Sequence, residues 1–181
     1  MLDAEQLDDV LSKSRKEIIE YVYDQFGEQI KRVIFTYVKN HAQTDDIFQE
    51  FLITVYHKIN TYKGKSKFET WLYRIAVNKC KDYLRSPIHR LFKHNEQLEE
   101  SRIDLSPENK VYLAEIEIDI VEAILSLPVK YREVIVLRFY KTFSIKEISE
   151  TLKVKESTVK TRLSRGKKKI QLILGGDYIE K

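Results

Sequence analysis

Cations and hydroxyl groups are concentrated between residues 156 and 169. At helical spacing, Val159 and Leu163 form an inward face. The outward face then carries Glu156, Ser157, Lys160, Thr161, Ser164 and Arg165. Short hydrogen-bonding groups and cations of this kind reach base edges and phosphates from a helix in a major groove.

A shorter helix and a tight turn must position this face. Ser144 can cap the shorter helix, whose apolar residues are Ile145, Ile148 and Leu152, and Val154 lies in the turn. Small residues are common in such units at the places held here by Ser149 and Lys153, and Lys153 needs a left-handed backbone. The pattern predicts a DNA-binding helix-turn-helix; the alternative is a basic surface helix on an ordinary helical hairpin.

Composition excludes several classes of protein. The 181 residues allow one domain or two small ones. No window approaches the roughly 20 apolar residues of a membrane span. The acidic N-terminus does not resemble a signal peptide. The single cysteine, Cys80, excludes an internal disulfide and favours a cytoplasmic location. The four histidines show no metal-ligand spacing, so we expect no metal site and no cofactor.

Charge is distributed unevenly. Residues 58–90 hold nine Lys/Arg against two acids, and residues 129–181 hold fourteen against six, whereas residues 91–126 hold three against nine. Two basic blocks separated by an acidic one predict two modules that face nucleic acid, joined by a connector that avoids it. The alternative is that these charges form ordinary solvated faces.

The apolar pattern predicts an all-α protein, because it is 3.6-periodic nearly everywhere and glycine and proline are few. In the first module we expect a helix over residues 14–39, with a break near Gly27 left open, and Val33, Ile34 and Tyr37 inward. A second helix begins at Thr44, and a third spans 68–85 after a loop around Gly64. The second module begins near Val111, with helices over 111–127 and 128–141 before the helix-turn-helix.

Three segments carry a family resemblance. TDDIFQEFLITVY, FETWLYRIAVNKCKDYLR and LPVKYREVIVLRFYKTFSIKEISETLKVKESTVKTRLSRGKKKI, in this order, resemble a bacterial RNA polymerase sigma factor. The short length resembles the extracytoplasmic-function (ECF) subfamily of the sigma-70 family. The resemblance implies an acidic N-terminal extension (1–20, without an assigned role), sigma region 2 (21–88), a flexible acidic linker (89–110) and sigma region 4 with the helix-turn-helix (111–175).

The resemblance implies that the first module docks on the β′ clamp helices of core polymerase. The residues concerned recur at i, i+3 and i+4, so they share a helix face: Asp45, Asp46, Gln49 and Glu50. Helix capping by Asp45 and Asp46 is the alternative, although it leaves Gln49 and Glu50 unexplained.

The resemblance also implies that the loop 60–67 and the helix from Phe68 open and read the −10 element. A loop with small and aromatic residues could hold a base flipped from the non-template strand. The residues implied for this role are Tyr62, Lys63, Ser66, Lys67, Arg74, Asn78, Lys81 and Arg85, with Lys65 and Lys79 as further phosphate contacts. Trp71 could be a stacking platform, but its spacing favours packing in the core.

In the second module, the positions that match −35 recognition in the family are Lys160, Thr161, Ser164 and Arg165. Phosphate contacts are expected from Thr158, Arg162, Lys167 and Lys168. Arg132 and Arg138 either join them or are surface charges.

The function implied is that of an alternative sigma factor, which binds core polymerase through the β′ clamp helices and β flap and melts promoter DNA. It is not an enzyme: no nucleophile–base pair, phosphate loop or metal site is visible. We expect no small-molecule substrate and a monomer when free.

The acidic linker residues Glu96, Glu99, Glu100, Asp104 and Glu108 are expected near the RNA path. By resemblance, an anti-sigma factor, commonly membrane-anchored, holds the protein inactive at the inner face of the membrane until stress releases it.

The main alternative is a helix-turn-helix regulator that binds an operator as a dimer without joining polymerase. Stable homodimerisation and a palindromic site distinguish it. Another alternative is a protein-interaction module that mimics a sigma factor, against which Lys160 and Arg165 argue.

Overall fold

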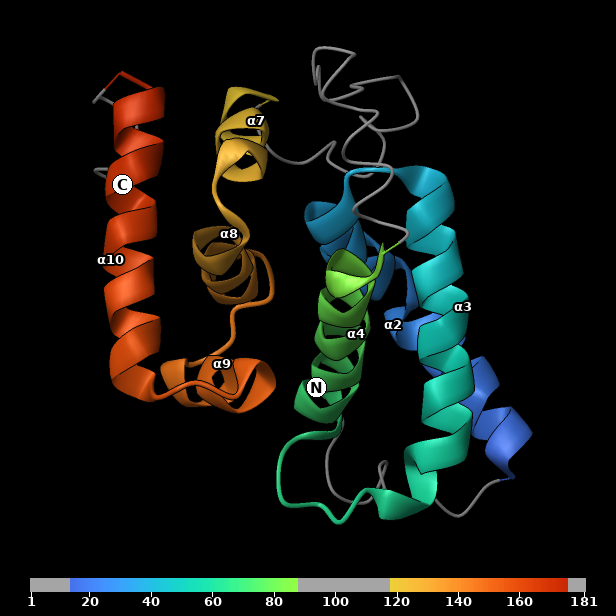
Figure 1. Ribbon diagram of the computed structural model, residues 1–181. Helices are drawn as coiled ribbons and strands as arrows, with labels where there is room; N and C mark the ends of the chain where they lie inside the picture. Colours follow the sequence, from blue (N-terminus) through green and yellow to red (C-terminus); the bar gives the residue numbers. More distant parts are fainter. Residues whose placement is uncertain (1–13, 88–117, 176–181) are drawn as a thin grey trace. The chain divides into compact units, whose positions relative to one another are not determined.

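Residues 14–87 and 118–175 are described in the computed structural model, and every regular element in these two ranges is helical (Figure 1). The chain divides into two units, residues 1–84 and 85–181. The predicted all-α fold with two helical domains is therefore confirmed. The acidic linker residues and residues 1–13 of the N-terminal extension lie outside the described residues.

Helix α2 (Arg15–Val38) begins at a capping box. The Ser14 Oγ accepts from the Glu17 backbone N–H at 3.3 Å, and the Glu17 carboxylate accepts from the Ser14 backbone N–H at 2.9 Å. The helix runs without interruption through Gly27, so the break left open at this glycine does not exist. Gly27 instead permits a close approach, since a Cβ there would stand 3.3 Å from the Phe48 ring.

Helix α3 (His41–Lys58) packs on α2. It begins three residues before Thr44, so the predicted start was wrong. The Asn40 side chain is the cap and accepts from the Gln43 backbone N–H at 3.0 Å, and Thr44 is buried with its hydroxyl donating to the Asn40 carbonyl. Asp45 and Asp46 therefore lie beyond the first three helical residues, where helix capping does not account for them.

Helix η1 (Ile59–Thr61) and a short loop lead to α4 (Phe68–Arg85), whose bounds match the prediction. Helices α2, α3 and α4 lie side by side (Figure 1). Their shared core holds the predicted Val33, Ile34 and Tyr37, together with Phe51 and Leu72, all buried. This apolar core fixes the direction in which the remaining faces of α3 and α4 point.

The second unit contains α7 (Ile118–Ser126), α8 (Val129–Ile135) and a π-helical segment, η2 (Val136–Tyr140). The helix expected over 128–141 thus changes to a wider turn after Ile135. Backbone N–H groups there bond five or six residues back, from Lys141 to the Val136 carbonyl and from Phe143 to the Leu137 carbonyl. Residues 111–117, the predicted start of this module, lie outside the described residues.

Helices α9 (Ile145–Leu152) and α10 (Glu156–Ile173) form the predicted helix-turn-helix. Ser144 and Glu147 make a second capping box, and Lys153 adopts the expected left-handed backbone at φ 54°. The Ser149 hydroxyl donates to the Val154 carbonyl at 2.6 Å across the turn. Serine at this place therefore contributes a hydrogen bond that the usual small apolar residue lacks.

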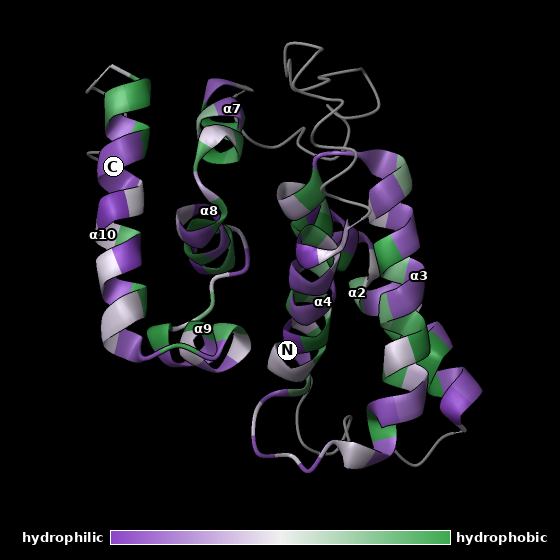
Figure 2. Ribbon diagram, viewed as in Figure 1, coloured by the Kyte–Doolittle hydropathy of each residue, from purple (hydrophilic) through white to green (hydrophobic). Residues whose placement is uncertain are grey.

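Hydrophilic and hydrophobic residues alternate along α10 (Figure 2). Its buried residues are Val159, Leu163, Gly166 and Ile170. Gly166 brings α10 close to α8, because a Cβ there would stand 3.1 Å from the Ile135 Cγ1. In the described parts of the chain, no helix is both long enough and apolar enough to cross a membrane.

Candidate nucleic-acid interface

The outward face of α10 presents the predicted −35 residues to solvent. Lys160, Thr161, Ser164 and Arg165 are all exposed, and so are Glu156 and Ser157. The Thr161 hydroxyl donates to the Ser157 carbonyl at 2.9 Å, which leaves its lone pairs free to accept. The four predicted −35 residues thus offer two cationic donors and two hydroxyls to a groove.

A surface hollow of about 340 Å³ lies between the start of α8 and the start of α10. Its lining consists of Lys130, Tyr131, Ser157, Thr158, Thr161, Arg162 and Arg165. Burial alone would raise the pKa of Tyr131, but a hydrogen bond from Arg165 and the charges of Lys130, Arg165 and Lys169 lower it overall. The Arg165 guanidinium therefore lies next to Tyr131 of α8. Nothing in the sequence pattern indicated this contact.

Arg162 differs from the other predicted phosphate contacts. Thr158 is half-buried, and Lys167 and Lys168 are exposed. The Arg162 Nη1 donates to the Glu133 Oε1 at 2.9 Å, and the Glu133 side chain on α8 is only 3% exposed. The structure thus gives the Arg162 guanidinium a partner within its own unit.

Arg132 and Arg138 occupy distinct places. Arg132 is buried, and its Nε and Nη2 donate to the Leu127 carbonyl at 3.2 and 2.7 Å. The Arg132 guanidinium thus binds the backbone at the connection between α7 and α8. This place differs from both of the predicted roles, a phosphate contact and a surface charge. Arg138 is exposed, and its Nη1 donates to the Phe143 carbonyl at 3.0 Å.

In the first unit, the loop before α4 is pinned by Tyr62. The Tyr62 hydroxyl donates to the Ser66 carbonyl at 2.7 Å, and its ring lies 5.3 Å from Phe68 and 5.5 Å from Trp71, centroid to centroid. Partial burial raises the pKa of this phenol. The Tyr62 ring therefore supports the loop from within, and Trp71 is half-buried at the edge of the same aromatic cluster.

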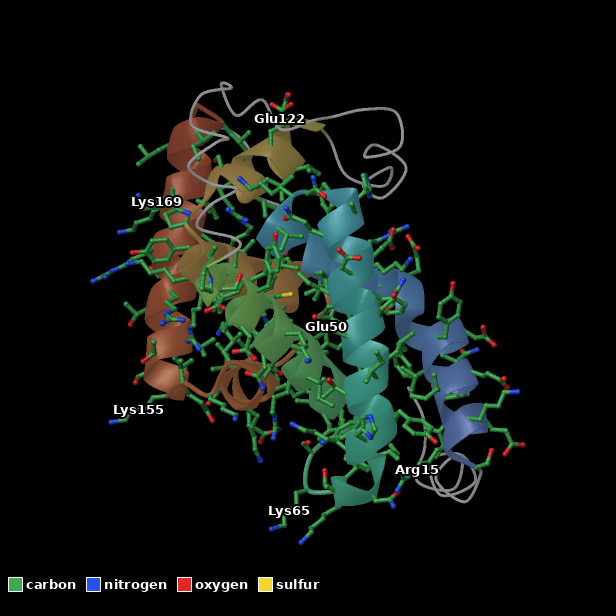
Figure 3. All side chains as sticks on the ribbon, turned by 45° about the vertical axis from the view of Figure 1, so that its right-hand side comes forward. Arg15, Glu50, Lys65, Glu122, Lys155 and Lys169 are labelled. Atoms are coloured by element: carbon green, nitrogen blue, oxygen red, sulfur yellow. The ribbon has the colours of Figure 1, made fainter. Side chains whose placement is uncertain are left out.

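Lysines surround this loop. Lys63, Lys65 and Lys67 are exposed, and Lys65 extends away from the helices (Figure 3). The remaining predicted −10 residues lie on α4: Arg74, Asn78 and Lys81 are half-buried, and Arg85 is exposed. The Arg74 Nε is enclosed and has no hydrogen-bond partner.

The predicted docking face lies on α3, where Asp45, Asp46, Gln49 and Glu50 are all exposed. Two of the acids are paired with lysines of neighbouring helices. Lys31 of α2 donates to Asp45 at 2.7 Å, and Lys79 of α4 donates to Glu50 at 3.2 Å. Lys79, expected at phosphates, is thus held at the docking face.

Sequence reasoning missed one apolar member of this face. Ile53 is 58% exposed and follows Gln49 by four residues, so it lies on the same side of α3. The sequence signal available for Ile53 was its spacing of four residues from Gln49. In the structure Ile53 lies outside the buried residues of α3, which are Thr44, Ile47, Phe48, Phe51 and Val55.

Residues 14–87 and 118–175 contain no group of three or more His, Cys, Asp or Glu side chains that could hold a metal ion. Cys80 is fully buried, which raises the pKa of its thiol and makes it unreactive.

Two helical units, one with an exposed cationic recognition helix, define a DNA-binding protein of the transcription-factor class. The Sigma-70 region 2 family matches residues 22–87, and the Sigma-70, region 4 family matches residues 117–170. The chain is 31% identical over 170 residues to the ECF RNA polymerase sigma factor SigW of Bacillus subtilis, covering 89% of this chain and 91% of that protein. This chain belongs to the ECF subfamily of RNA polymerase sigma factors.

Other relatives agree. The ECF RNA polymerase sigma-E factor of Haemophilus influenzae is 29% identical over 182 residues, covering 93% of this chain and 96% of that protein. Among solved structures, CnrH in complex with the cytosolic domain of CnrY shares the fold with a TM-score of 0.66 at 19% identity, covering 94% and 96% of the two chains. The sigma factor RpoE of Bartonella quintana, solved in complex with the anti-sigma factor NepR, has a TM-score of 0.64 at 19% identity, covering 83% and 92%.

Proposed function

We propose that this ECF sigma factor divides promoter recognition and polymerase binding among three surfaces. Helix α10 reads the −35 element, the loop 62–67 with α4 holds the melted −10 strand, and the outward face of α3 docks on core RNA polymerase. The observation that carries the proposal is the exposed stripe of α10, where cations and hydroxyls stand together on one face of a capped helix-turn-helix.

On α10, we assign base contacts to Lys160, Thr161, Ser164 and Arg165. Lysine and arginine donate to the guanine acceptors in the major groove, and hydroxyls adapt to either base edge. Thr158, Lys167 and Lys168 contact the flanking phosphates, because they lie beside this stripe on the same helix. These contacts set the register of α10 on the duplex.

At the −10 element, the aromatic cluster under the loop supplies rigidity and the lysines supply charge. Tyr62 fixes the loop through its bond to the Ser66 carbonyl, so Lys63 and Lys67 face the single strand from a defined backbone. On α4, Asn78 offers its amide to a base, and Arg74, Lys81 and Arg85 hold phosphates.

On α3, the docking surface consists of Asp45, Asp46, Gln49 and Glu50, with Ile53 as an apolar contact. A carboxylate face suits a basic partner helix, and the resemblance places the β′ clamp helices there, with the β flap contacting the second unit. The Lys31–Asp45 and Lys79–Glu50 pairs are surface pairs of small free energy, so the partner's cations can replace these lysines.

Regulation and location follow from the family. We propose that an anti-sigma factor, of the kind seen with RpoE of Bartonella quintana, holds the protein inactive until stress releases it. The protein acts in the cytoplasm, where polymerase is, and polymerase supplies all of the chemistry. The sigma factor itself then needs no catalytic centre and no cofactor.

Permanganate footprinting on a responsive promoter tests this division. Core polymerase with this protein should expose unpaired thymines around the −10 element, and core polymerase alone should not. Protection of a palindromic duplex site by a homodimer, unchanged by polymerase, contradicts the proposal and favours the dimeric regulator.

A further inference from the structure

Two arginines of α10 lie beside side chains of α8. Arg162 donates to Glu133 at 2.9 Å, and Arg165 lines the same surface hollow as Tyr131. Tyr131 and Glu133 are two residues apart on α8, so both neighbours come from one short stretch of helix. Arg162 sits between Thr161 and Ser164, two of the side chains assigned to the −35 bases.

The Glu133–Arg162 pair is enclosed to an unusual degree. The Glu133 side chain is 3% exposed and that of Arg162 is 25% exposed. A buried carboxylate that loses a charged partner is strongly destabilised, because the low-polarity surroundings cannot replace the interaction. Arg162 therefore cannot turn to a DNA phosphate without breaking its ion pair with Glu133, which would destabilise the fold.

The surrounding packing makes the pair sensitive to the placement of α10. Gly166, one turn further along α10, allows contact with Ile135 and with the Tyr131 Cβ, where an added Cβ would stand 3.1–3.6 Å away. A shift or rotation of α10 on α8 breaks either this close contact or the ion pair. The two contacts together fix the direction in which the outward face points.

We propose that Arg162 is a positioning residue and not a phosphate contact. Its ion pair with Glu133 sets the orientation of α10, and through it the affinity for the −35 element. This inference rests on the proposed reading of the −35 element by α10, and it replaces the sequence-based prediction that Arg162 binds phosphate. Lys168, exposed on the same helix, remains a phosphate contact.

The test compares Arg162→Met, Glu133→Gln and the double variant in the full-length protein bound to core polymerase. Lys168→Met is the matched control, since it removes a cation from the same helix without touching α8. Binding to a duplex promoter and to a copy with a scrambled −35 element is measured over a range of salt concentrations. Urea unfolding of each free variant is recorded in parallel.

The positioning role predicts that Arg162→Met lowers the preference for the intact −35 element about tenfold or more. The double variant recovers much of that loss, because it removes the buried negative charge together with the arginine that pairs with it. The slope of log affinity against log salt stays unchanged in the double variant, whereas Lys168→Met lowers its magnitude by about 0.9. Unfolding of the four proteins in the cycle shows strong coupling between residues 133 and 162.

A double variant that binds as weakly as Arg162→Met, with its salt slope reduced as in Lys168→Met, overturns the inference and makes Arg162 a phosphate contact. Additive unfolding free energies overturn it as well, and this readout needs no DNA. Failure of the proposed function gives a different result: none of the variants, Lys168→Met included, alters the preference for the −35 element or the salt slope.

Discussion

The face of α3 proposed to dock on polymerase and the face of α10 proposed to read DNA are both charged helix surfaces, but they are supported differently. On α3, the carboxylates of Asp45 and Glu50 are 53% and 65% exposed, and they pair with lysines over an apolar core that does not depend on them. On α10, the neighbouring Arg162 bonds to a carboxylate that is 3% exposed. Exposed pairs contribute about 0–1 kcal/mol, whereas breaking a buried pair costs about 3–5 kcal/mol. We therefore expect that substitutions of the α3 acids can change polymerase binding without a large loss of stability. On α10, we expect loss of the Arg162 ion pair to lower both DNA binding and stability.

The largest effect is expected where that coupling is broken. Arg162→Ala should lower the free energy of unfolding of the second unit by about 3–5 kcal/mol, because the buried Glu133 carboxylate loses its ion pair with Arg162. Lys79→Ala, the matched loss in the first unit, should cost about 0–1 kcal/mol. Urea unfolding followed by circular dichroism measures both, and equal costs for the two variants would remove the contrast between the helices.

Reversal of one charge on the docking face gives the next effect. Glu50→Lys should abolish association with core polymerase, a loss of about 100-fold or more, equivalent to ~3 kcal/mol. The new lysine faces Lys79 as well as the basic partner. DNA binding by the second unit and thermal stability should remain close to those of the parent protein. Pull-down with purified core enzyme measures the association.

Asp24→Lys is the control for this reversal, because Asp24 is an exposed acid on α2 outside the docking face. It makes the same change in net charge and should bind core polymerase normally. If both variants lose binding equally, overall charge and not the α3 face governs docking.

Removal of a base contact is expected to have a smaller effect. Lys160→Ala and Arg165→Ala should each weaken discrimination for the −35 element by about 1–3 kcal/mol, and core binding should be unchanged. Filter binding of the polymerase complex to promoters with single −35 substitutions shows which base each residue reads. Loss of core binding in either variant would contradict the division of labour between the units.

The smallest effect concerns the cap of α9. Ser144→Ala should cost about 1 kcal/mol of unfolding free energy, because the Glu147 backbone N–H loses its acceptor. Ser14→Ala removes the equivalent cap of α2 and should cost a similar amount. Since α9 sets the turn, only Ser144→Ala should also weaken promoter binding, which a parallel binding titration checks.

Sequence periodicity was sufficient for the placement of most helices and for their exposed faces. The α4 bounds, the Ser144 cap, the left-handed Lys153 and the exposure of Lys160 and Arg165 all follow from local spacing and backbone preference. The start of α3 was misplaced because Asn40 competes with Thr44 as a cap, and local sequence favours both.

Tertiary partners could not be predicted in the same way. The Glu133–Arg162 pair joins residues 29 positions apart, and the bond of Arg132 to the Leu127 carbonyl depends on the bend between α7 and α8. An arginine on a basic helix gives the same local signal whether it faces DNA or a buried acid. The packing of Tyr62 could not be predicted from the sequence either, because only the folded loop shows that its ring turns toward Phe68 and Trp71.

Run-off transcription on sheared bacterial genomic DNA, with purified core RNA polymerase in the presence and absence of this protein, shows whether the protein directs transcription initiation. We expect discrete new start sites that share a −35 and a −10 element, and their loss with Glu50→Lys. Sequence-specific duplex binding by a homodimer, without core association or new transcripts, would contradict this expectation.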